Sequence, residues 1–468
     1  MRKDRFASAA LLAFVAAFGA LTMPREVYPG DPTAMREEAR SIVLWQRLGI
    51  APEIASRVGE PGQYFVPGPD GRWYSKYGSL NGALFALPLL AQAMVRGTLP
   101  PLGADGEPLF LNLFNLALAL LLAALLFRLA RPRARSPWTA ALFVALCFYT
   151  GYLWNYLRAQ GPELFQVVLF TALVERWRAD REKRTARTTA AVWALFAALC
   201  LSKISYLALA PALVGFEWRK RGAKKALGWA APGLGAAAVV LAGLHAIKFG
   251  SPFLIGYHAW RPDLHAFTGE WAQSLYGLIL DAHWSIPLHF PVLFLAALGL
   301  RRAKDRELPA FALVCLGLIW LAVGGFVLWR GEYCYGPRFF LFALPALALP
   351  AVEGLETLRD GLKAPAGAMQ ATLAAVLFGF AFAQQRAIAR FPFMAHQMLR
   401  EPLHGRMSEP VAKLFFGRHQ SAVLRDLEAA EGKAERLSWW PSVQALGPEA
   451  AKDYERRAAW LYERRGLR

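Results

Sequence analysis

The sequence contains little charge for its length. Only 19% of its 468 residues are charged and 56% are apolar, whereas an average globular protein carries about 25% charged residues. Apolar runs separated by short basic loops recur along most of the chain, which is typical of a multi-spanning membrane protein. The composition therefore excludes an ordinary soluble protein.

Cysteine is scarce too, and its spacing gives neither a disulfide framework nor a metal site. Three cysteines sit in apolar runs and the fourth in a loop: Cys147, Cys200, Cys315 and Cys334. His283 and His289 flank "WSIPL" with no carboxylate or further histidine at helical ligand spacing, so a tetrahedral metal site is not indicated. The sequence also lacks a Gly-rich phosphate loop, a Rossmann fingerprint and a Ser-His-Asp arrangement, so nothing supports nucleotide-driven chemistry.

Acidic residues are outnumbered by basic ones, 34 against 53, which gives a formal charge of +19. Such an excess is common in proteins that bind nucleic acid. Here the excess lysine and arginine lie mainly in short loops between apolar runs, where they set the orientation of membrane helices. No basic face with aromatic stacking positions accompanies them, so we expect no nucleic-acid partner.

The apolar runs predict an all-α, polytopic membrane protein. The first run extends from Phe6 to about Met23 after a basic start. It lacks a convincing small-x-small cleavage site, so we interpret it as an uncleaved first span with a cytoplasmic N-terminus. Further candidate spans begin near residues 108, 137, 162, 188, 204, 226, 286, 308, 338 and 366. Together these runs give about eleven spans.

The run from Leu80 to Val95 decides the topology. If it crosses the membrane, the basic loops "RLARPRAR", "ERWRADREKRTAR", "WRKRGAKK" and "RRAKDRE" all face outward, against the positive-inside rule. If it is a re-entrant or surface-lying helix, all four loops face the cytoplasm. We therefore interpret it as a non-spanning helix, which a membrane protein tolerates where protein or a watery cavity covers its polar groups.

This topology divides the chain into two parts. Residues 1–385 form a predicted transmembrane domain, and residues 386–468 form a polar tail that is helical in part and lies on the outer side. Within the first part, residues 24–107 become one long external loop with juxtamembrane helices. Because this loop is far longer than a typical connection, we expect it to be functional.

Asp31 follows the first span in "YPGDPTAMREEAR". An Asp before Pro, with Glu37 and Glu38 further on, fits an ordinary helix N-terminus. The functional alternative is a carboxylate that faces a cavity at the membrane surface and acts as a general base.

The stretch "DGRWYSKYGSLNGALFALPLL" contains a second candidate, Lys76. Its neighbours Tyr74 and Tyr77 suit the headgroup level of a bilayer, and we expect them to contact substrate. Lys76 itself is either an interfacial anchor or an ammonium that meets a lipid phosphate.

Three further candidates lie at predicted external ends of spans. Arg158 and Glu163 occur in "LWNYLRAQGPELFQ", and Lys203 occurs in "LCLSKISYLAL". A Pro-Glu pair is an ordinary start to a helix. At this depth, however, Glu163 could also hold an acceptor hydroxyl, a sugar or a divalent cation, and we take Arg158 and Lys203 as candidate ligands of a lipid phosphate.

The later external loops add Tyr257, in "FGSPFLIGYHAWRPD", and Glu332 and Arg338, in "LWRGEYCYGPRFFLFALPALALP". Arg338 enters the predicted bilayer edge, where an unpaired charge costs several kcal/mol, so it is a functional candidate. Glu332 either neutralises Arg338 or contacts substrate with Tyr257.

One acid after the first span and several cations near the same interface imply an anionic, membrane-anchored substrate, such as a polyprenyl-phosphate sugar. Its phosphate would be held by lysine or arginine, and a carboxylate would deprotonate the attacking hydroxyl. No nucleotide is needed, because the lipid phosphate is the leaving group and cations stabilise the charge that develops on it.

These motifs resemble the multi-spanning GT-C glycosyltransferases, which include the protein O-mannosyltransferases, the aminoarabinose transferase that acts on lipid A and the bacterial Rgt-like proteins. The resemblance covers roughly residues 5–385. It rests on the order of four short motifs: "GDPTAMREEAR", "GRWYSKYGSLNGALFALPLL", "FGSPFLIGY" and "YGPRFFLFALPALAL".

The resemblance implies roles for four residues. Asp31 is similar to the catalytic Asp of the first loop, Lys76 to the basic residue that contacts the lipid phosphate, Glu163 to an acid of the second external loop, and Arg338 to the Arg of the "GPR" stretch. The chain departs from the family where many members have two adjacent acids in the first loop, since Pro32 follows Asp31 here.

A second departure is Gly78-Ser79, which stands where many members have Pro-Pro or Pro-Gly. Several members of the family use a divalent cation. This sequence does not require one, and the metal dependence stays open.

The expected function is therefore that of an inverting glycosyltransferase in a bacterial-type inner membrane, with its active site on the periplasmic or outer face. The acceptor is a glycan, a lipid or a protein. The alternatives are a flippase or transporter for a lipid-linked sugar, a surface-glycan polymerase or ligase, and a non-catalytic member. The transferase hypothesis predicts that Asp31, Lys76, Glu163 and Arg338 border one outward-facing cavity.

Overall fold

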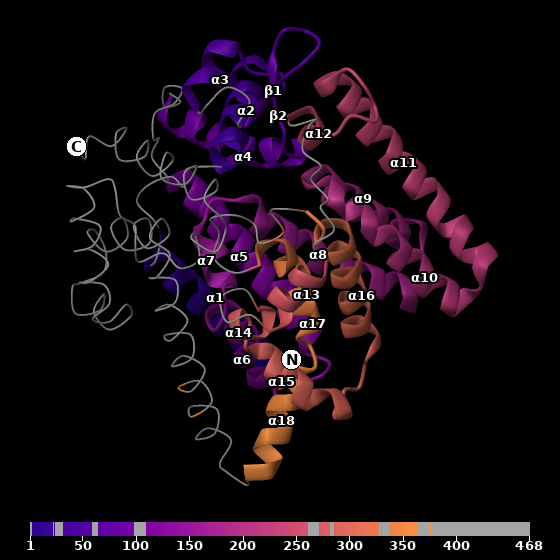
Figure 1. The fold of residues 1–468 in the computed structure, drawn as a ribbon. Coiled ribbons are helices and arrows are strands. Elements are labelled where there is room, and N and C mark those ends of the chain that lie inside the picture. The colour runs from indigo at the N-terminus through magenta and orange to yellow at the C-terminus, as the bar shows by residue number, and fades with distance from the viewer. Residues whose placement is uncertain are drawn as a thin grey trace.

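Helices make up nearly all of the structure (Figure 1). The computed structural model describes residues 2–21, 23, 31–58, 64–97, 109–260, 271–280, 285–326, 329, 337–362, 372 and 375. Glu332, the predicted polar tail from residue 386 and almost all of the candidate span from about residue 366 lie outside these residues.

The elements follow the apolar runs of the sequence. The first region contains α1 (Arg2–Leu21), α2 (Asp31–Trp45), α3 (Pro52–Val58), β1 (Phe65–Pro67), β2 (Trp73–Ser75) and α4 (Ser79–Arg96). The central helices are α5 (Leu109–Ala130), α6 (Pro137–Tyr149), α7 (Leu153–Arg158), α8 (Pro162–Glu182), α9 (Ala186–Ser202), η1 (Ile204–Leu209), α10 (Ala210–Arg221) and α11 (Ala223–Phe249). The last described elements are α12 (Gly256–Trp260), α13 (Trp271–Ile279), α14 (Ile286–His289), α15 (Val292–Gly299), η2 (Leu300–Arg302), α16 (Glu307–Val323), η3 (Arg338–Ala343), α17 (Leu344–Leu347) and α18 (Ala351–Leu362).

The apolar helices identify an integral membrane protein. Within the described ranges, α5 and α11 are each long and apolar enough to cross a bilayer. The stretches Arg338–Leu347 and Ala351–Gly361, which meet at a bend of 55°, add a third crossing if they are counted as one span. Helices α6, α9 and α16 are apolar but shorter. The figure of about eleven spans stays a prediction.

Ion pairs join the N-terminus and two of the basic loops at one end of the helices. Asp4 of α1 pairs with Arg131 across 2.8 Å. Arg133, from the same basic loop, pairs with Glu353 of α18 across 3.1 Å. Its Nη2 also donates to the carbonyl oxygen of Asp305, in another basic loop, across 2.9 Å.

The other basic loops meet at this end as well. Arg181 pairs with Glu217 of α10 across 3.3 Å and with Glu307 of α16 across 2.7 Å. Lys220 Nζ donates to the carbonyl oxygen of Arg181 across 3.1 Å. All four basic loops therefore lie at one end of the molecule, which we call the basic end.

This arrangement fixes where α4 lies. Helix α1 starts at the basic end and α5 finishes there, so the chain between them begins and ends at the opposite end. Helix α4 packs on α2 and against α5 and α9, and Asn81 Nδ2 donates to the carbonyl oxygen of Ser202, at the end of α9, across 3.0 Å. The structure therefore favours the non-spanning interpretation of Leu80–Val95.

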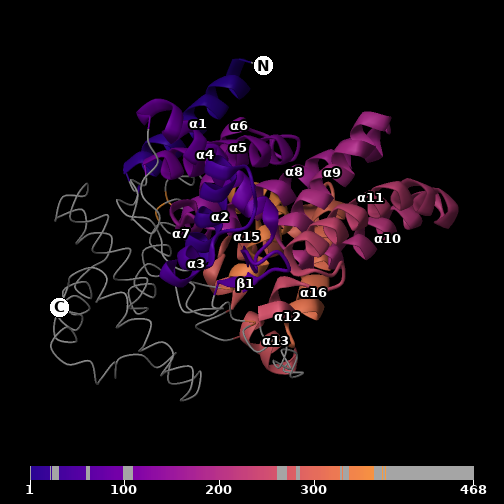
Figure 2. The same cartoon turned by 90° about the horizontal axis from the view of Figure 1, so that it is seen from above.

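Helices α2, α3 and α4 and the hairpin β1–β2 form a platform at the end away from the basic loops (Figures 1 and 2). Met35 and Ala39 of α2 pack against Phe85 and Leu89 of α4 in a small apolar core. Apolar side chains at helical spacing on both helices explain this contact. Phe85 also packs on Phe165 of α8, with ring centroids 5.1 Å apart, so this core attaches the platform to the central helices.

The hairpin is the part of the platform that an all-α prediction misses. Val66 pairs with Tyr74 in an antiparallel ladder, and Gly71 takes a positive φ of 75° in the turn between the strands. Glycine adopts this conformation without strain. Each strand has three residues, which is too short for a period-2 pattern to be recognised in the sequence.

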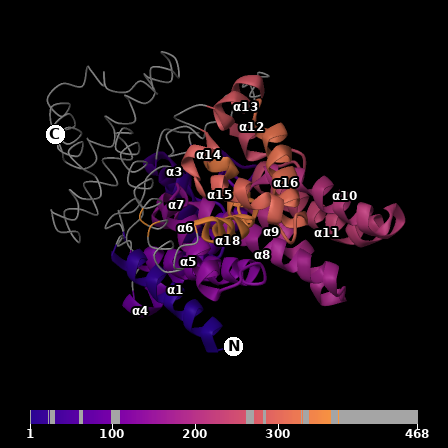
Figure 3. The same cartoon turned by 90° about the horizontal axis from the view of Figure 1, so that it is seen from below.

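The membrane domain is packed by aromatic side chains. Trp177 stacks on Phe311 with ring centroids 4.3 Å apart, and Phe170 meets Phe342 edge to face at 4.8 Å. At the basic end, α18 lies beside α15 and α6 (Figure 3). Phe342 belongs to η3, so its contact with Phe170 holds η3 against α8, and η3 begins at Arg338.

Candidate functional site

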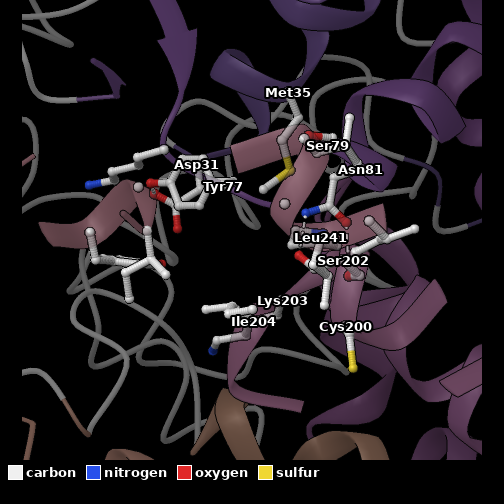
Figure 4. Close-up of a pocket in the computed structure, with 18 of the residues that line it drawn as sticks. Asp31, Met35, Tyr77, Ser79, Asn81, Cys200, Ser202, Lys203, Ile204 and Leu241 are labelled. Carbon is white, nitrogen blue, oxygen red and sulfur yellow. Dashed lines mark hydrogen bonds between the residues drawn. The ribbon is translucent and has the colours of Figure 1, made fainter. Parts of the chain in front are cut away.

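A cavity lies where the platform meets the ends of α8, α9, α11 and η3. The cavity and the open solvent at its mouth together occupy about 770 Å³. Its polar lining consists of Asp31, Lys76, Tyr77, Ser79, Asn81, Glu163, Gln166, Ser202, Lys203, His245, Lys248, Tyr257 and Arg338. Figure 4 shows Asp31 beside Tyr77 in one part of it and Asn81 beside Ser202 in another.

Asp31 begins α2 and presents its carboxylate to this cavity, with 24% of the side chain exposed. The hydroxyl of Tyr77 donates to Oδ1, and Arg338 Nη1 lies 3.1 Å from Oδ2. An acid is also favoured at a helix N-terminus. Asp31 therefore lies in the first described turn of α2 and faces the cavity.

These neighbours control the ionisation of Asp31. Burial alone raises the pKa of a carboxyl, but the charges of Arg338 and Lys76 and the hydrogen bonds from Tyr77 and Arg338 outweigh it and lower the pKa of Asp31 below its ordinary value. Burial and the charge of Asp31 raise the pKa of Tyr77 well above its ordinary value. Asp31 is therefore an anion near neutral pH, and Tyr77 is a neutral donor to it.

Arg338 bridges two acids. Its Nη1 lies 3.1 Å from Asp31 and 3.3 Å from Oε1 of Glu163, in the first turn of α8. The hydroxyl of Tyr152 donates to the carbonyl oxygen of Pro337 across 3.3 Å. This bond orients the backbone immediately before Arg338, so the guanidinium is held between the two carboxylates.

Two lysines add positive charge to the same part of the cavity. Lys76 Nζ lies 5.3 Å from the ring centroid of Tyr77 and 5.7 Å from that of Tyr257. Lys203 Nζ lies 3.4 Å from the ring centroid of Phe339. Aromatic faces attract cations, and here they hold both ammonium groups at the cavity wall. With Arg338, three cations face two carboxylates.

The structure separates the candidate residues predicted from the sequence. It brings Asp31, Lys76, Glu163 and Arg338 together around one cavity and adds three other candidates, Tyr77, Lys203 and Tyr257.

Of the three remaining candidates, Tyr74 is described and does not line this cavity. We expected Tyr74 to contact substrate, but its side chain is buried in the hairpin, where its hydroxyl donates to Asp70 across 2.9 Å. Arg158 ends α7, but its side chain lies outside the described part of the structure. Glu332 lies outside it entirely.

Sequence reasoning missed two groups of polar residues that lie in the cavity wall or directly behind it. One is the pair formed by Lys248 and Glu38, whose Nζ and Oε1 lie 3.3 Å apart. The other is a chain of neutral polar side chains: Ser202 Oγ donates to Asn81 Oδ1 across 2.9 Å, and Gln166 Nε2 donates to Ser202 Oγ across 3.3 Å. Both lie between segments far apart in the chain, so no local motif announces them.

No group of three or more histidine, cysteine, aspartate or glutamate side chains suited to a metal ion occurs among the described residues. Asp31 and Glu163 line the same cavity, but Arg338 lies between them and contacts both. The guanidinium of Arg338 therefore supplies positive charge to both carboxylates.

No protein-family model and no curated protein matches this sequence. Solved structures do match its fold. The crystal structure of ArnT from Cupriavidus metallidurans bound to undecaprenyl phosphate aligns with a TM-score of 0.52 at 14% identity, over 91% of this chain and 79% of that one. The chain has the ArnT fold. The apo ArnT structure from the same organism aligns with a TM-score of 0.47 at 15% identity over the same shares of the two chains.

The match to the ArnT fold agrees with the mostly helical membrane architecture that the sequence predicts. At this level of identity the likeness concerns the fold alone. The function of the cavity therefore has to follow from the residues that line it.

Proposed function

We propose that the chain is a membrane glycosyltransferase that moves a sugar from a polyprenyl-phosphate donor to the hydroxyl of a glycan, lipid or protein acceptor. One observation carries the proposal: Asp31 faces the same cavity as the cations Lys76, Lys203 and Arg338. The ArnT fold supports it, because the ArnT structure with the higher TM-score is bound to undecaprenyl phosphate.

Asp31 acts as the general base. The acceptor oxygen attacks the anomeric carbon of the donor while the bond from that carbon to the phosphate oxygen breaks, and the electron pair leaves with the phosphate. Attack from the face opposite the leaving group inverts the anomeric centre. The acceptor proton passes to Asp31, which is ionised because its pKa is lowered.

The cations stabilise the leaving group. The phosphodiester of the donor carries one negative charge, and the released phosphate monoester carries up to two. Lys76, Lys203 and Arg338 border the cavity in which this charge develops, and fixed charges in such a site lower the barrier. As the phosphate attracts Arg338 and Lys76, it also weakens their hold on Asp31, which makes the carboxylate a better base.

Glu163, Tyr77 and Tyr257 complete the proposed site. Glu163 holds Arg338 from the side opposite Asp31 and can accept a hydrogen bond from a hydroxyl of the acceptor. Tyr77 orients Asp31 through its hydroxyl. Tyr257 packs edge to face on Tyr77 at 6.3 Å and forms part of the wall beside Lys76.

The same geometry orients the protein in a membrane. Basic loops favour the cytoplasm, and the cavity lies at the end away from them. We therefore propose an inner-membrane enzyme of the bacterial type whose active site opens to the periplasmic or outer side. Arg338 supplies positive charge between Asp31 and Glu163. The proposed reaction therefore uses no divalent cation, and transfer should persist in EDTA.

A transfer assay tests this function. Purified protein in detergent would be mixed with acceptor membranes and a panel of radiolabelled polyprenyl-phosphate sugars, and both sugar transfer and release of free polyprenyl phosphate would be measured. The proposal expects the two products in equal amounts for at least one donor.

Other outcomes point to other functions. Movement of intact donor across proteoliposomes with no cleavage supports a flippase. Extension of a lipid-linked glycan that needs no polyprenyl-monophosphate sugar supports a polymerase or ligase. Either result contradicts the proposed reaction.

A further inference from the structure

A buried ammonium lies beneath the site. Lys248, in the last turn of α11, is 1% exposed. Its Nζ donates to the carbonyl oxygen of Tyr77 across 3.0 Å, to Glu38 Oε1 across 3.3 Å and to Ser79 Oγ across 3.4 Å. An ammonium has three protons, so the protein itself supplies an acceptor for each of them.

Lys248 differs in setting from the other two lysines of the cavity. Lys76 and Lys203 lie against aromatic faces, whereas the hydrogen bonds of Lys248 connect α2 with the stretch before α4. Lys248 would have to give up a carbonyl or a carboxylate in order to bind a phosphate. Lys248 borders the cavity, but its hydrogen bonds connect two segments of the chain.

The three acceptors of Lys248 belong to the two segments that carry Asp31, the proposed general base, and Tyr77, its hydrogen-bond donor. Tyr77 and Ser79 lie in the stretch that leads into α4, next to Lys76. Glu38 lies on α2, seven residues after Asp31, and the hydroxyl of Tyr77 reaches back to Asp31. One ammonium thus ties the segment that donates this hydrogen bond to the helix that accepts it.

We propose that Lys248 is a positioning residue for the transfer reaction, whose ammonium sets the Tyr77 segment against α2 so that the hydroxyl of Tyr77 faces Asp31. The inference rests on the proposed function, in which Asp31 and Lys76 act on the substrate. It assigns Lys248 no contact with donor or acceptor.

The carboxylate of Glu38 is buried and closely packed where it contacts Lys248. A Cβ at Gly82 would lie 2.7 Å from Glu38 Oε2, so the backbone of α4 packs closely over the carboxylate. Burial raises the pKa of Glu38 to about 7, and the charge and hydrogen bond of Lys248 act against that rise. Removing Lys248 would leave a buried carboxylate and a buried carbonyl without their donor, which is destabilising.

The kinetic test compares wild type with Lys248→Met and Lys248→Arg in the full-length protein. We expect Lys248→Met to lower kcat by about 100-fold, as misplacement of a catalytic group does, while the KM for the donor changes less than about threefold. Lys248→Arg keeps the charge and should recover part of the loss. In a double-mutant cycle, Tyr77→Phe should add little to Lys248→Met, because both remove the same orientation of Asp31.

Three results would overturn the inference. One is a normal kcat for Lys248→Met at equal amounts of folded protein. Another is a loss confined to the donor KM, which would make Lys248 a phosphate ligand. The third is a fully additive effect with Tyr77→Phe. If Lys248→Met does not accumulate, two milder variants replace it: Ser79→Ala removes one acceptor, and Glu38→Gln removes the negative charge that faces the ammonium. Each should lower kcat by a smaller factor, and a normal kcat in both would count equally against the inference.

Hydrogen–deuterium exchange gives a readout that needs no turnover. Faster exchange is expected in Lys248→Met over residues 76–82 and 31–40, with no change in the loops of the basic end. Unchanged exchange in the first two segments would contradict the positioning role even if transfer occurs. Absence of transfer by the wild type with every donor would instead overturn the proposed function, and the exchange result would still decide whether Lys248 joins these segments.

Discussion

At the scale of single residues, Arg338 offsets the negative charges of the cavity. It is held 3.1 Å from Asp31 and 3.3 Å from Glu163, so one guanidinium neutralises much of the charge of two carboxylates. Lys76 and Lys203 then leave the cavity with an excess of positive charge. An anionic headgroup would enter a cavity of this kind readily, because charge-assisted hydrogen bonds to phosphate are strong.

We expect Arg338→Ala and Lys76→Ala each to raise the KM for a polyprenyl-phosphate donor by about 10-fold or more, since a charge-assisted hydrogen bond is worth about 1.5–3 kcal/mol. Arg128→Ala is the matched control, because that arginine is 59% exposed at the basic end, and its KM should equal that of wild type. An unchanged donor KM in both cavity variants would remove these residues from phosphate binding.

Glu38 predicts a pH dependence of stability. Because the folded state raises its pKa from an ordinary value of 4.5 to about 7, the folded state binds a proton more tightly than the unfolded state. The stability that protonated Glu38 contributes is present below pH 4.5 and is lost as pH rises through about 7.

The apparent Tm of wild type should therefore fall between pH 5 and pH 7.5 more steeply than that of Glu38→Gln, which has no proton to lose. Glu182→Gln, at a carboxylate that is 66% exposed, should behave as wild type does. Equal slopes for wild type and Glu38→Gln would contradict the assignment.

At the scale of elements, close backbone approaches hold the platform on the membrane domain. A Cβ at Gly78 would meet the carbonyl oxygens of Leu201 and Ser202, at the end of α9. A Cβ at Gly256 would meet the carbonyl oxygen of Lys76. Glycine at these two places lets the loop that carries Lys76 and Tyr77 lie directly on α9 and α12.

Gly78→Ala should therefore lower kcat by about 10-fold or more, since even small displacements of catalytic groups are costly. Gly215→Ala in α10 is the control, because no atom lies within 4 Å of a Cβ built there, and alanine is the better helix former. Normal turnover by Gly78→Ala at normal abundance would show that the loop tolerates a shift.

These elements also show what the sequence could and could not predict. The charge of the loops predicted a non-spanning helix over Leu80–Val95. Ionisable residues at predicted bilayer edges pointed to Asp31, Lys76 and Arg338, which border one cavity in the structure. Lys248 and Glu38 stayed hidden because they lie 210 positions apart, and a helix-start pattern accounts for Glu38 just as well. The strands β1 and β2 were missed because three residues carry too little periodicity.

At the scale of the whole molecule, the two ends differ in character. The basic end contains the N-terminus and four basic loops tied together by ion pairs such as Asp4–Arg131 and Arg181–Glu307. The opposite end contains the platform and the cavity. This polarity predicts that the cavity opens on the non-cytoplasmic side.

Cysteine labelling in intact cells tests that orientation. Arg47→Cys, on the platform, should react with an impermeant maleimide, and Arg219→Cys, at the basic end, should react only after the membrane is permeabilised. Both would be made in a Cys334→Ser background, where the remaining cysteines Cys147, Cys200 and Cys315 are buried. The reverse pattern would place the cavity in the cytoplasm.

The role of Asp31 is tested most directly by transfer of radiolabelled sugar from a polyprenyl-phosphate donor by wild type and by Asp31→Asn at matched abundance. Asparagine keeps the shape of the side chain and removes its basicity. The account predicts that kcat falls by about 10²–10⁴-fold while Asp31→Asn still binds undecaprenyl phosphate. Turnover by Asp31→Asn at the wild-type rate would contradict it.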